Sequence, residues 1–288
     1  MGAPAVVVRP ISDADTGAAS RFLHQHLNQR VSAAAWGRLL APPWKADAPN
    51  RGFQLLSDDG AVVGVYAAVY SDRDIAGERV PFCNLAAFCV LEEYRAHSLR
   101  LVRALLGQKG YVFTDLSPSG NVIALNERLG FQRLDTATRL VANLPRPQRG
   151  TRVTTAPAAL DHVLTGRDAE IHRDHRQAPA AQHVLVERGG EHGYLVYRRD
   201  RRKRLPFFAT PLYAGGDPGV LQAAWPAVSA HLLRQGLPLT LAERRVLGFT
   251  PGGPGVELAG PRPRMFRAKD VGAESIDHLY SELTLVRW

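Results

Sequence analysis

The chain has 288 residues, of which 45% are hydrophobic, and this length can bury one large core or two of ordinary size. Its 36 Lys and Arg against 27 Asp and Glu give a net charge of +9, which favours an anionic partner; the alternative is a surface that is merely well solvated. Two cysteines on one apolar run exclude a disulfide framework, and without an export signal or an apolar run of about 18 residues we expect a cytoplasmic protein with no membrane span.

The first 70 or so residues predict a strand, a helix and a hairpin in that order. Residues 6–8 are β-branched, and apolar side chains recur at helical spacing over 16–30. The proline-rich segment 41–52 predicts a loop that either lies over a substrate mouth or is a plain surface connection. Residues 53–56 and 61–70 flank an Asp-Asp-Gly turn and predict a hairpin.

The most informative stretch is 82–131, which predicts strand, loop, helix, strand and helix. An apolar run over 82–91 meets a charged turn, and leucines and a valine then recur at helical spacing. Residues 111–116 are rich in β-formers, and a Ser-Pro-Ser-Gly turn begins a second helix that ends at Gly130.

A proline-rich linker over 145–150 divides the chain, so we predict one domain over 1–148 and a second over 149–288. After the linker, a hairpin, a long strand over 205–213, a helix and a strand over 237–241 repeat the plan of the first half. We interpret this as a tandem fold, although any α/β domain gives a similar series.

Residues 82–131 resemble the core of the GNAT superfamily of N-acetyltransferases. The resemblance covers residues 5–144 and, more weakly, the remainder. It implies an α/β (mixed α+β) fold with a central mixed sheet flanked by helices. It also implies two such domains in tandem, the second of them degenerate. The family holds acetyl-CoA or another acyl-CoA with an Arg/Gln-x-x-Gly-x-Gly/Ala loop, and the aligned residues here are Arg95, Ala96, His97, Ser98, Leu99 and Arg100.

The physical basis of that loop is the attraction of free backbone N–H groups and a helix dipole for a pyrophosphate. Ser98 can cap the helix, whereas the side chain of Arg100 must point away or pair with a phosphate, so the pocket is narrowed, rebuilt or lost. The family also pairs the pantetheine arm with backbone where two strands splay apart. The residues at this gap are Phe88, Cys89 and Val90, which are otherwise ordinary core positions.

The second family signature places an Asn at the start of the next helix and Leu-Gly-Phe at its end, and Asn121 matches the first of these. Asn126 stands where the family has the Tyr that protonates the leaving thiolate, and an amide cannot donate that proton. The general base is unassigned, because the long strand has no carboxylate, and the candidates are Asp115, Glu92, Glu93 or a water.

Two further clusters have competing interpretations. His172 and His175 can meet on one helical face as metal ligands, but a solvated helix is the more economical interpretation, and we predict no metal site. The run 198–204 (RRDRRKR) suits phosphates, nucleic acid or acidic partners, or is a solvated loop. Because no aromatic residue interleaves with it, nucleic acid is not favoured as a partner.

Together these features predict an acyltransferase that moves an acyl group from a CoA thioester to the amine or hydroxyl of an unknown acceptor. One alternative is a GNAT-fold binding protein that has lost catalysis. Another is a transferase that takes its acyl group from aminoacyl-tRNA.

Overall fold

The structure, a computed structural model, describes residues 5–146, 148–202 and 205–287, and the side chain of Asn121 lies outside the described part. It contains two compact units. The first unit comprises Met1–Leu134, Arg264–Ser275 and Tyr280–Val286, and the second comprises Asp135–Pro263, Ile276–Leu279 and Arg287–Trp288. Their division at 134/135 differs from the predicted boundary at 148/149.

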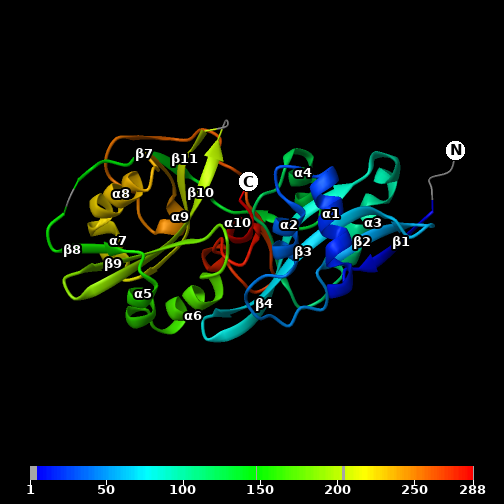
Figure 1. The fold of residues 1–288 in the computed structure, drawn as a ribbon, viewed down its shortest axis with the longest axis horizontal. Coiled ribbons are helices and arrows are strands. Elements are labelled where there is room, and N and C mark those ends of the chain that lie inside the picture. Colours follow the sequence, from blue (N-terminus) through cyan, green and yellow to red (C-terminus); the bar gives the residue numbers. More distant parts are fainter. Residues whose placement is uncertain (1–4, 147, 203–204, 288) are drawn as a thin grey trace. The chain divides into compact units, whose positions relative to one another are not determined.

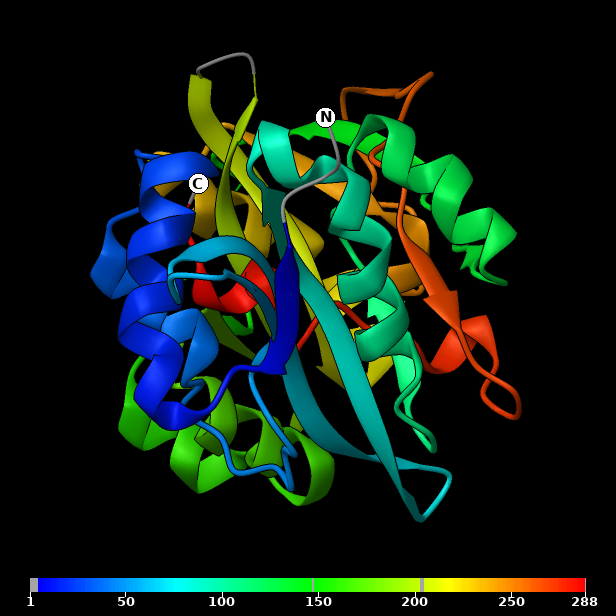
Figure 2. The same cartoon turned by 90° about the vertical axis from the view of Figure 1, so that its right-hand side faces the viewer.

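The first unit is built on a seven-stranded mixed sheet (Figure 1). Its strands, in spatial order, are β1 (Val6–Pro10), β2 (Gly52–Ser57), β3 (Val62–Ile75), β4 (Glu78–Val90), β5 (Val112–Asp115), β14 (Met265–Arg267) and β6 (Gln132–Arg133). Its helices are α1 (Thr16–His26), α2 (Ala33–Leu40), α3 (Ser98–Leu106), α4 (Gly120–Arg128) and the short α10 (Glu282–Leu285). Figure 2 shows α1 and α2 on one side of this sheet and α3 and α4 on the other.

The apolar periodicity explains how these elements pack. Val102 and Leu105 of α3 are buried in the core, as their helical spacing predicts, whereas Leu99, which shares that spacing, is 48% exposed and Leu101 is buried in its place. Helix α4 ends before Gly130, whose φ of 85° lies in the left-handed region that glycine adopts without strain. Strands β3 and β4 form a long antiparallel hairpin whose turn includes Gly77.

Strands β4 and β5 are paired over only part of their length. Their parallel register runs from Phe82 opposite Val112 to Asn84 opposite Thr114. In the described part of the chain the pairing ends there, although β4 continues to Val90. The two strands therefore separate beyond Asn84, and the β5 side of the later β4 backbone has no strand beside it.

The second unit has its own seven-stranded mixed sheet. Its strands, in spatial order, are β8 (Thr151–Thr154), β9 (Gln182–Arg188), β10 (Glu191–Arg202), β11 (Leu205–Gly216), β12 (Leu239–Glu243), β7 (Thr138–Ala142) and β13 (Gly255–Glu257). Its helices are α5 (Pro157–Val163), α6 (Gly166–His175), α7 (Pro218–Ala223), α8 (Trp225–Arg234) and α9 (Arg244–Leu247). The side chain of Asp217 caps α7, with Pro218 in the first turn.

The two sheets follow one plan, which confirms the tandem arrangement. In each, a meander of antiparallel strands leads into a parallel pair, β4 with β5 and β11 with β12. The next position is filled by a strand from far along the chain: β14 lies beside β5, and β7 lies beside β12. The two halves of the chain, before and after the linker, thus contribute one strand each to the other half's sheet. The boundary between the compact units differs from 148/149 because β7 pairs with strands of the second sheet and β14 with those of the first.

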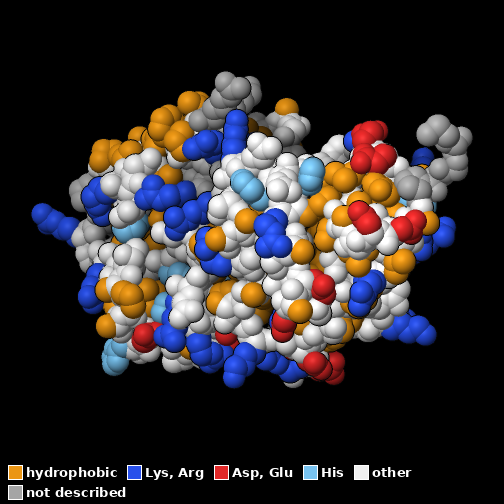
Figure 3. All heavy atoms as spheres, turned by 45° about the vertical axis from the view of Figure 1, so that its right-hand side comes forward, with side chains coloured by type: hydrophobic (Ala, Val, Ile, Leu, Met, Phe, Trp, Pro, Cys, Tyr) orange, Lys and Arg blue, Asp and Glu red, His pale blue; other side chains and the backbone are white. Residues whose placement is uncertain are grey.

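No helix in the described ranges is both long and apolar enough to cross a membrane. Basic side chains outnumber acidic ones on the face that Figure 3 presents, in keeping with the net charge of +9.

Candidate active site and associated pockets

A buried polar network lies where β4 and β5 separate. Asp115, the last residue of β5, accepts a hydrogen bond from Nδ2 of Asn126 on α4 at 2.8 Å. Both side chains are buried. The structure therefore brings together the two residues that the sequence nominated for catalysis, although this contact does not test their roles.

A second carboxyl group joins the network from the C-terminal segment. Glu282 of α10 is fully buried and accepts hydrogen bonds from Nδ2 of Asn84 at 2.5 Å and from Oγ of Ser117 at 2.6 Å. Asn84 in turn accepts a hydrogen bond from the hydroxyl of Thr114 at 2.9 Å. Because Asn84 and Thr114 are the last paired residues of their strands, the network closes the base of the gap between β4 and β5.

The electrostatics of this network favour protonated carboxyl groups. Burial, and then the nearby charge of Glu282, raises the pKa of Asp115 to about 7, while the hydrogen bond from Asn126 opposes the shift. Burial also raises the pKa of Glu282, against the lowering effects of Ser117, Asn84 and Arg264. The charge of each carboxyl group disfavours ionisation of the other, which adds to the effect of burial on Asp115.

Glu282 was missed by sequence reasoning because 198 residues separate it from Asn84. The available signal was a lone carboxylate inside the apolar stretch 279–286, which is costly to bury unless it is hydrogen-bonded.

The predicted cofactor loop differs from the expected one. Residues 92–97 form a 3₁₀ turn, and α3 begins at Ser98, so Ser98 is the first helical residue and not the cap; His97 takes the capping position without a side-chain hydrogen bond. Ala96 belongs to the same turn, and the side chain of Leu99 is exposed.

Neither arginine of the loop is held ready for a phosphate. Arg95 pairs with Glu92 at 2.8 Å on the surface. Arg100 donates from Nη1 to the backbone carbonyl of Val6 at 2.9 Å, which directs its side chain toward β1. What remains at the start of α3 is backbone N–H groups, of which that of Ser98 already donates to the carbonyl of Arg95.

The residues predicted at the gap do lie on the unpaired part of β4. Phe88, Cys89 and Val90 pair with β3 on one side, and Phe88 packs on Tyr66 with ring centroids 4.7 Å apart. Phe88 and Val90 contact the core, while Cys89 is half-buried and its thiol pKa is raised by burial. The placement of Asn121 against a cofactor lies outside the described side chains.

The segment 41–52 is tied to the first unit by Trp44, whose indole N–H donates to the carbonyl of Tyr70 at 2.9 Å. The hydroxyl of Tyr70 donates to Asn50 at 2.7 Å and accepts from Gln108 at 2.8 Å. These contacts are those of an anchored surface connection.

The second unit contains a polar pocket of about 460 Å³ with a histidine in its wall. Nδ1 of the buried His172 lies 3.1 Å from Oδ1 of Asp161. Neighbouring His183 contacts the carbonyl of His175 through Nε2 at 3.2 Å and the hydroxyl of Tyr194 through Nδ1 at 2.7 Å. A carbonyl only accepts, so Nε2 of His183 carries the proton, and burial lowers the pKa of this ring to about 4.

These contacts overturn the solvated-helix interpretation of His172 and His175, since α6 buries both. Nδ1 of His175 contacts the carbonyl of Ile171 on its own helix at 3.0 Å, whereas His172 turns to Asp161. The two rings do not form a ligand pair, and within the described ranges no group of three or more His, Cys, Asp or Glu is arranged to hold a metal ion.

The basic run begins at the end of β10, and its residues 203–204 lie outside the described part. Arg198 and Asp200 are buried, whereas Arg199 and Arg201 line a second cavity of about 420 Å³. The run is thus neither a uniform patch nor a fully solvated loop.

Comparison with known proteins identifies the fold. A GCN5-related N-acetyltransferase from Anabaena variabilis is 12% identical, with a TM-score of 0.59 over 91% of this chain and 72% of its own. A putative acetyltransferase from Pyrococcus horikoshii is 14% identical, with a TM-score of 0.54 over 96% and 93% of the two chains. A GCN5-related N-acetyltransferase from Kribbella flavida is 16% identical, with a TM-score of 0.55 over 92% and 71%.

No family model and no curated protein sequence matches the chain. At these identities the structural likeness shows the fold alone: the chain has the mixed α+β fold of these solved acetyltransferases, as residues 82–131 predicted.

Proposed function

We propose that the chain is an acyltransferase that moves an acetyl or other acyl group from a CoA thioester to an amine or hydroxyl acceptor. The observation that carries this proposal is the buried pair of Asp115 and Glu282 at the base of the gap between β4 and β5. A carboxyl group with a pKa of about 7 suits proton transfer in neutral solution, and the adjacent open strand suits an extended, amide-bearing arm.

The acyl donor would be held mainly by backbone. The unpaired side of β4 at Phe88, Cys89 and Val90 would offer main-chain groups to the pantetheine arm. The backbone N–H groups in the first turn of α3 would bind the diphosphate. Such contacts require no glycine-rich sequence provided that the side chains point away, as that of Arg100 does.

Asp115 would move the proton. Its carboxylate accepts a proton from the attacking amine as nitrogen bonds to the thioester carbon; the C–S bond then breaks, and the protonated carboxyl returns a proton to the thiolate. Asn126 donates to Oδ2 of Asp115 and holds the carboxyl orientation, while Glu282 keeps its pKa high. A proton shuttle of this kind needs no tyrosine at position 126.

The test is a thiol-release assay with acetyl-CoA over a panel of amines, combined with calorimetric titration of CoA. We expect Asp115→Asn to reduce turnover by about a hundredfold or more with little change in CoA affinity, since proton transfer typically contributes that much. The matched control is Asp59→Asn, at an exposed turn of the same unit. Full turnover in Asp115→Asn would refute the assigned role.

A binding protein that has lost catalysis is the rival function. It is favoured by the loop arginines, both of which are engaged by protein groups, Arg95 with Glu92 and Arg100 with Val6. Absence of CoA binding by the wild-type protein would decide for it.

A further inference from the structure

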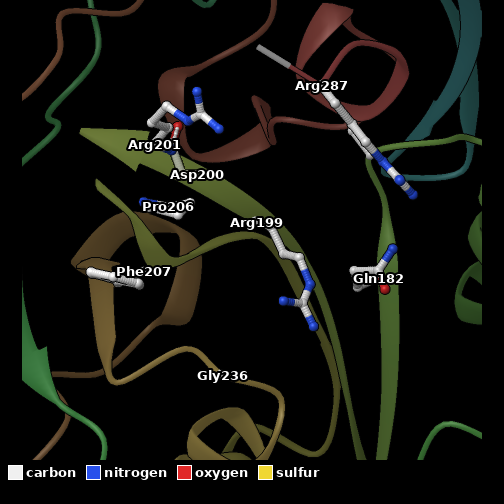
Figure 4. A pocket seen from close by; sticks show the side chains of 9 residues that line it. Gln182, Arg199, Asp200, Arg201, Pro206, Phe207, Gly236 and Arg287 are labelled. Carbon is white, nitrogen blue, oxygen red and sulfur yellow. Dashed lines mark hydrogen bonds between the residues drawn. The ribbon is translucent and has the colours of Figure 1, made fainter. Parts of the chain in front are cut away.

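The cavity of about 420 Å³ in the second unit has the lining of an anion site. It lies at the ends of β10 and β11 and receives Arg199, Arg201 and Arg287 (Figure 4). Its size falls in the range of small-molecule pockets, about 300–1,000 Å³. It belongs wholly to the second unit and is separate from the network of Asp115 and Glu282.

The one carboxylate in the lining, Asp200, is already neutralised. Its Oδ2 accepts from Nη1 of Arg262 at 3.0 Å and from the hydroxyl of Thr210 at 3.2 Å, and its Oδ1 accepts from the backbone N–H of Arg201 at 2.8 Å. Asp200 therefore does not offset the charge of the three lining arginines, and the cavity keeps a net positive potential.

The arginine side chains retain donors for a ligand. Nε of Arg287 donates to the carbonyl of Pro179 at 2.6 Å, which fixes the side chain and leaves its terminal nitrogens. Arg199 makes one long contact, 3.5 Å from Nη2 to Oε1 of Gln235. Figure 4 shows Arg199 and Arg287 extending toward Gln182 from two sides.

The neighbouring aromatic side chain suggests what the rest of the ligand carries. Phe207 lines the same cavity and is 43% exposed, so its ring is accessible to a ligand there. Clustered guanidinium groups bind phosphoryl oxygens bidentately, and an exposed ring stacks on the flat face of a nucleobase. A surface that is only well solvated requires arginines but not this ring.

We propose that the second unit binds a nucleotide, with its phosphoryl groups on Arg199, Arg201 and Arg287 and its base on Phe207. Coenzyme A contains the same adenosine polyphosphate chemistry, so both free nucleotides and CoA are possible sources of the group. The site is independent of the acyl transfer proposed for the first unit.

The experiment is calorimetric titration of ATP, CoA and pyrophosphate into the full chain. We expect one ATP per chain, and a loss of affinity of about tenfold to a hundredfold in Arg199→Ala and in Arg201→Ala. Arg173→Ala removes the same charge at an exposed position outside the cavity and should leave affinity unchanged. Phe207→Ala should weaken ATP but not pyrophosphate. If the natural ligand is CoA, CoA should compete with ATP for the cavity. If the natural ligand is a free nucleotide, CoA should leave ATP binding unchanged.

Three results would overturn the proposal: no ATP binding by the wild type, an equal loss in Arg173→Ala, or tighter binding of a decauridylate than of ATP. The last would assign the cavity to single-stranded nucleic acid. Titration of ATP into Asp115→Asn separates the two proposals, because that variant should lose turnover and keep ATP affinity.

Discussion

At the scale of single residues, the molecule concentrates its unusual chemistry in one pair of carboxyl groups. Asp115 and Glu282 are both buried, and the pKa of each is raised. The hydrogen bond from Asn126 favours the ionised form of Asp115, whereas burial and Glu282 favour the protonated form. Substitutions at these residues should therefore shift the pH dependence of stability and of the reaction rate.

The first prediction concerns stability and pH. The folded pKa of Asp115, about 7, lies above the ordinary value of 3.8 for an aspartate, so the folded state retains a proton that the unfolded state has lost. The contribution of Asp115 to stability is full below pH 3.8 and is lost as pH rises toward 7. Asp115→Asn should remove this decline, on the order of a few kcal/mol, as measured by urea unfolding at pH 4 to 8. Parallel pH profiles for the variant and the wild type would contradict it.

A second prediction concerns Asn126. Asn126→Ala removes a donor that stabilises the Asp115 carboxylate, so the pKa of Asp115 should rise. If Asp115 is the base, the pH at which the rate is half-maximal should move upward, by about half a unit or more. The pH–rate profile measures this, with Asn28→Ala as a control far from the network in sequence and surface-exposed in part. An unshifted profile with a lower plateau would assign Asn126 a different role.

At the scale of elements, two short segments determine the site. The short helix α10 supplies Glu282, and the turn before α3 replaces a glycine-rich loop with engaged side chains. Glu282 bonds to residues of other elements, whereas Arg95 pairs with Glu92 inside the turn, so their contributions can be separated by substitution.

Glu282 should be worth more as an acceptor than as a charge. Glu282→Ala leaves the donor of Asn84 buried without its partner, at about 1–3 kcal/mol, and also removes the hydrogen bond from the exposed Ser117, which water can replace. Glu282→Gln keeps the shape and one acceptor, so urea unfolding should show a smaller loss of stability. Equal losses would mean that charge dominates.

The loop arginines should differ in what they affect. Arg100→Ala removes the contact with the carbonyl of Val6 and should lower stability by about 1 kcal/mol while leaving CoA affinity nearly unchanged. Arg95→Ala breaks a surface ion pair with Glu92 and should cost no more than about 1 kcal/mol. Thermal unfolding and CoA titration of both variants measure the difference. A hundredfold loss of CoA affinity in Arg100→Ala would show that its side chain turns to the ligand.

The sequence could predict the features that depend on residues close together in the chain, but not those that depend on residues far apart. The spacing of Val102 and Leu105 predicts α3, and the hydrogen-bonded Asp115 and Asn126 lie only eleven positions apart. Strands β7 and β14 are short, and an alternating pattern states that a strand is half-buried but not which strand lies beside it. For the same reason the position of Glu282 could not be inferred from motifs.

At the scale of the whole molecule, β7 and β14 connect the two halves of the chain that the linker at 145–150 separates in sequence. A fragment of residues 1–148 lacks both β14 and Glu282, so its sheet is incomplete. We predict that this fragment alone does not reach the folded state. In contrast, a chain nicked by protease near residue 150 should elute as one particle on size-exclusion chromatography, because each piece retains a strand in the other's sheet. Elution as two folded domains would instead support the predicted division at 148/149.

The exchange also imposes an order on biosynthesis. When the ribosome has released residues 1–134, β5 still presents an open edge, because its partner β14 follows only at 265–267. The first sheet must therefore stay incomplete until residues 265–267 have been synthesised, with an edge able to recruit strands from other nascent chains. A pause in translation between residues 134 and 267, or a chaperone that shields an exposed strand, would bear on yield more strongly than the composition of either half.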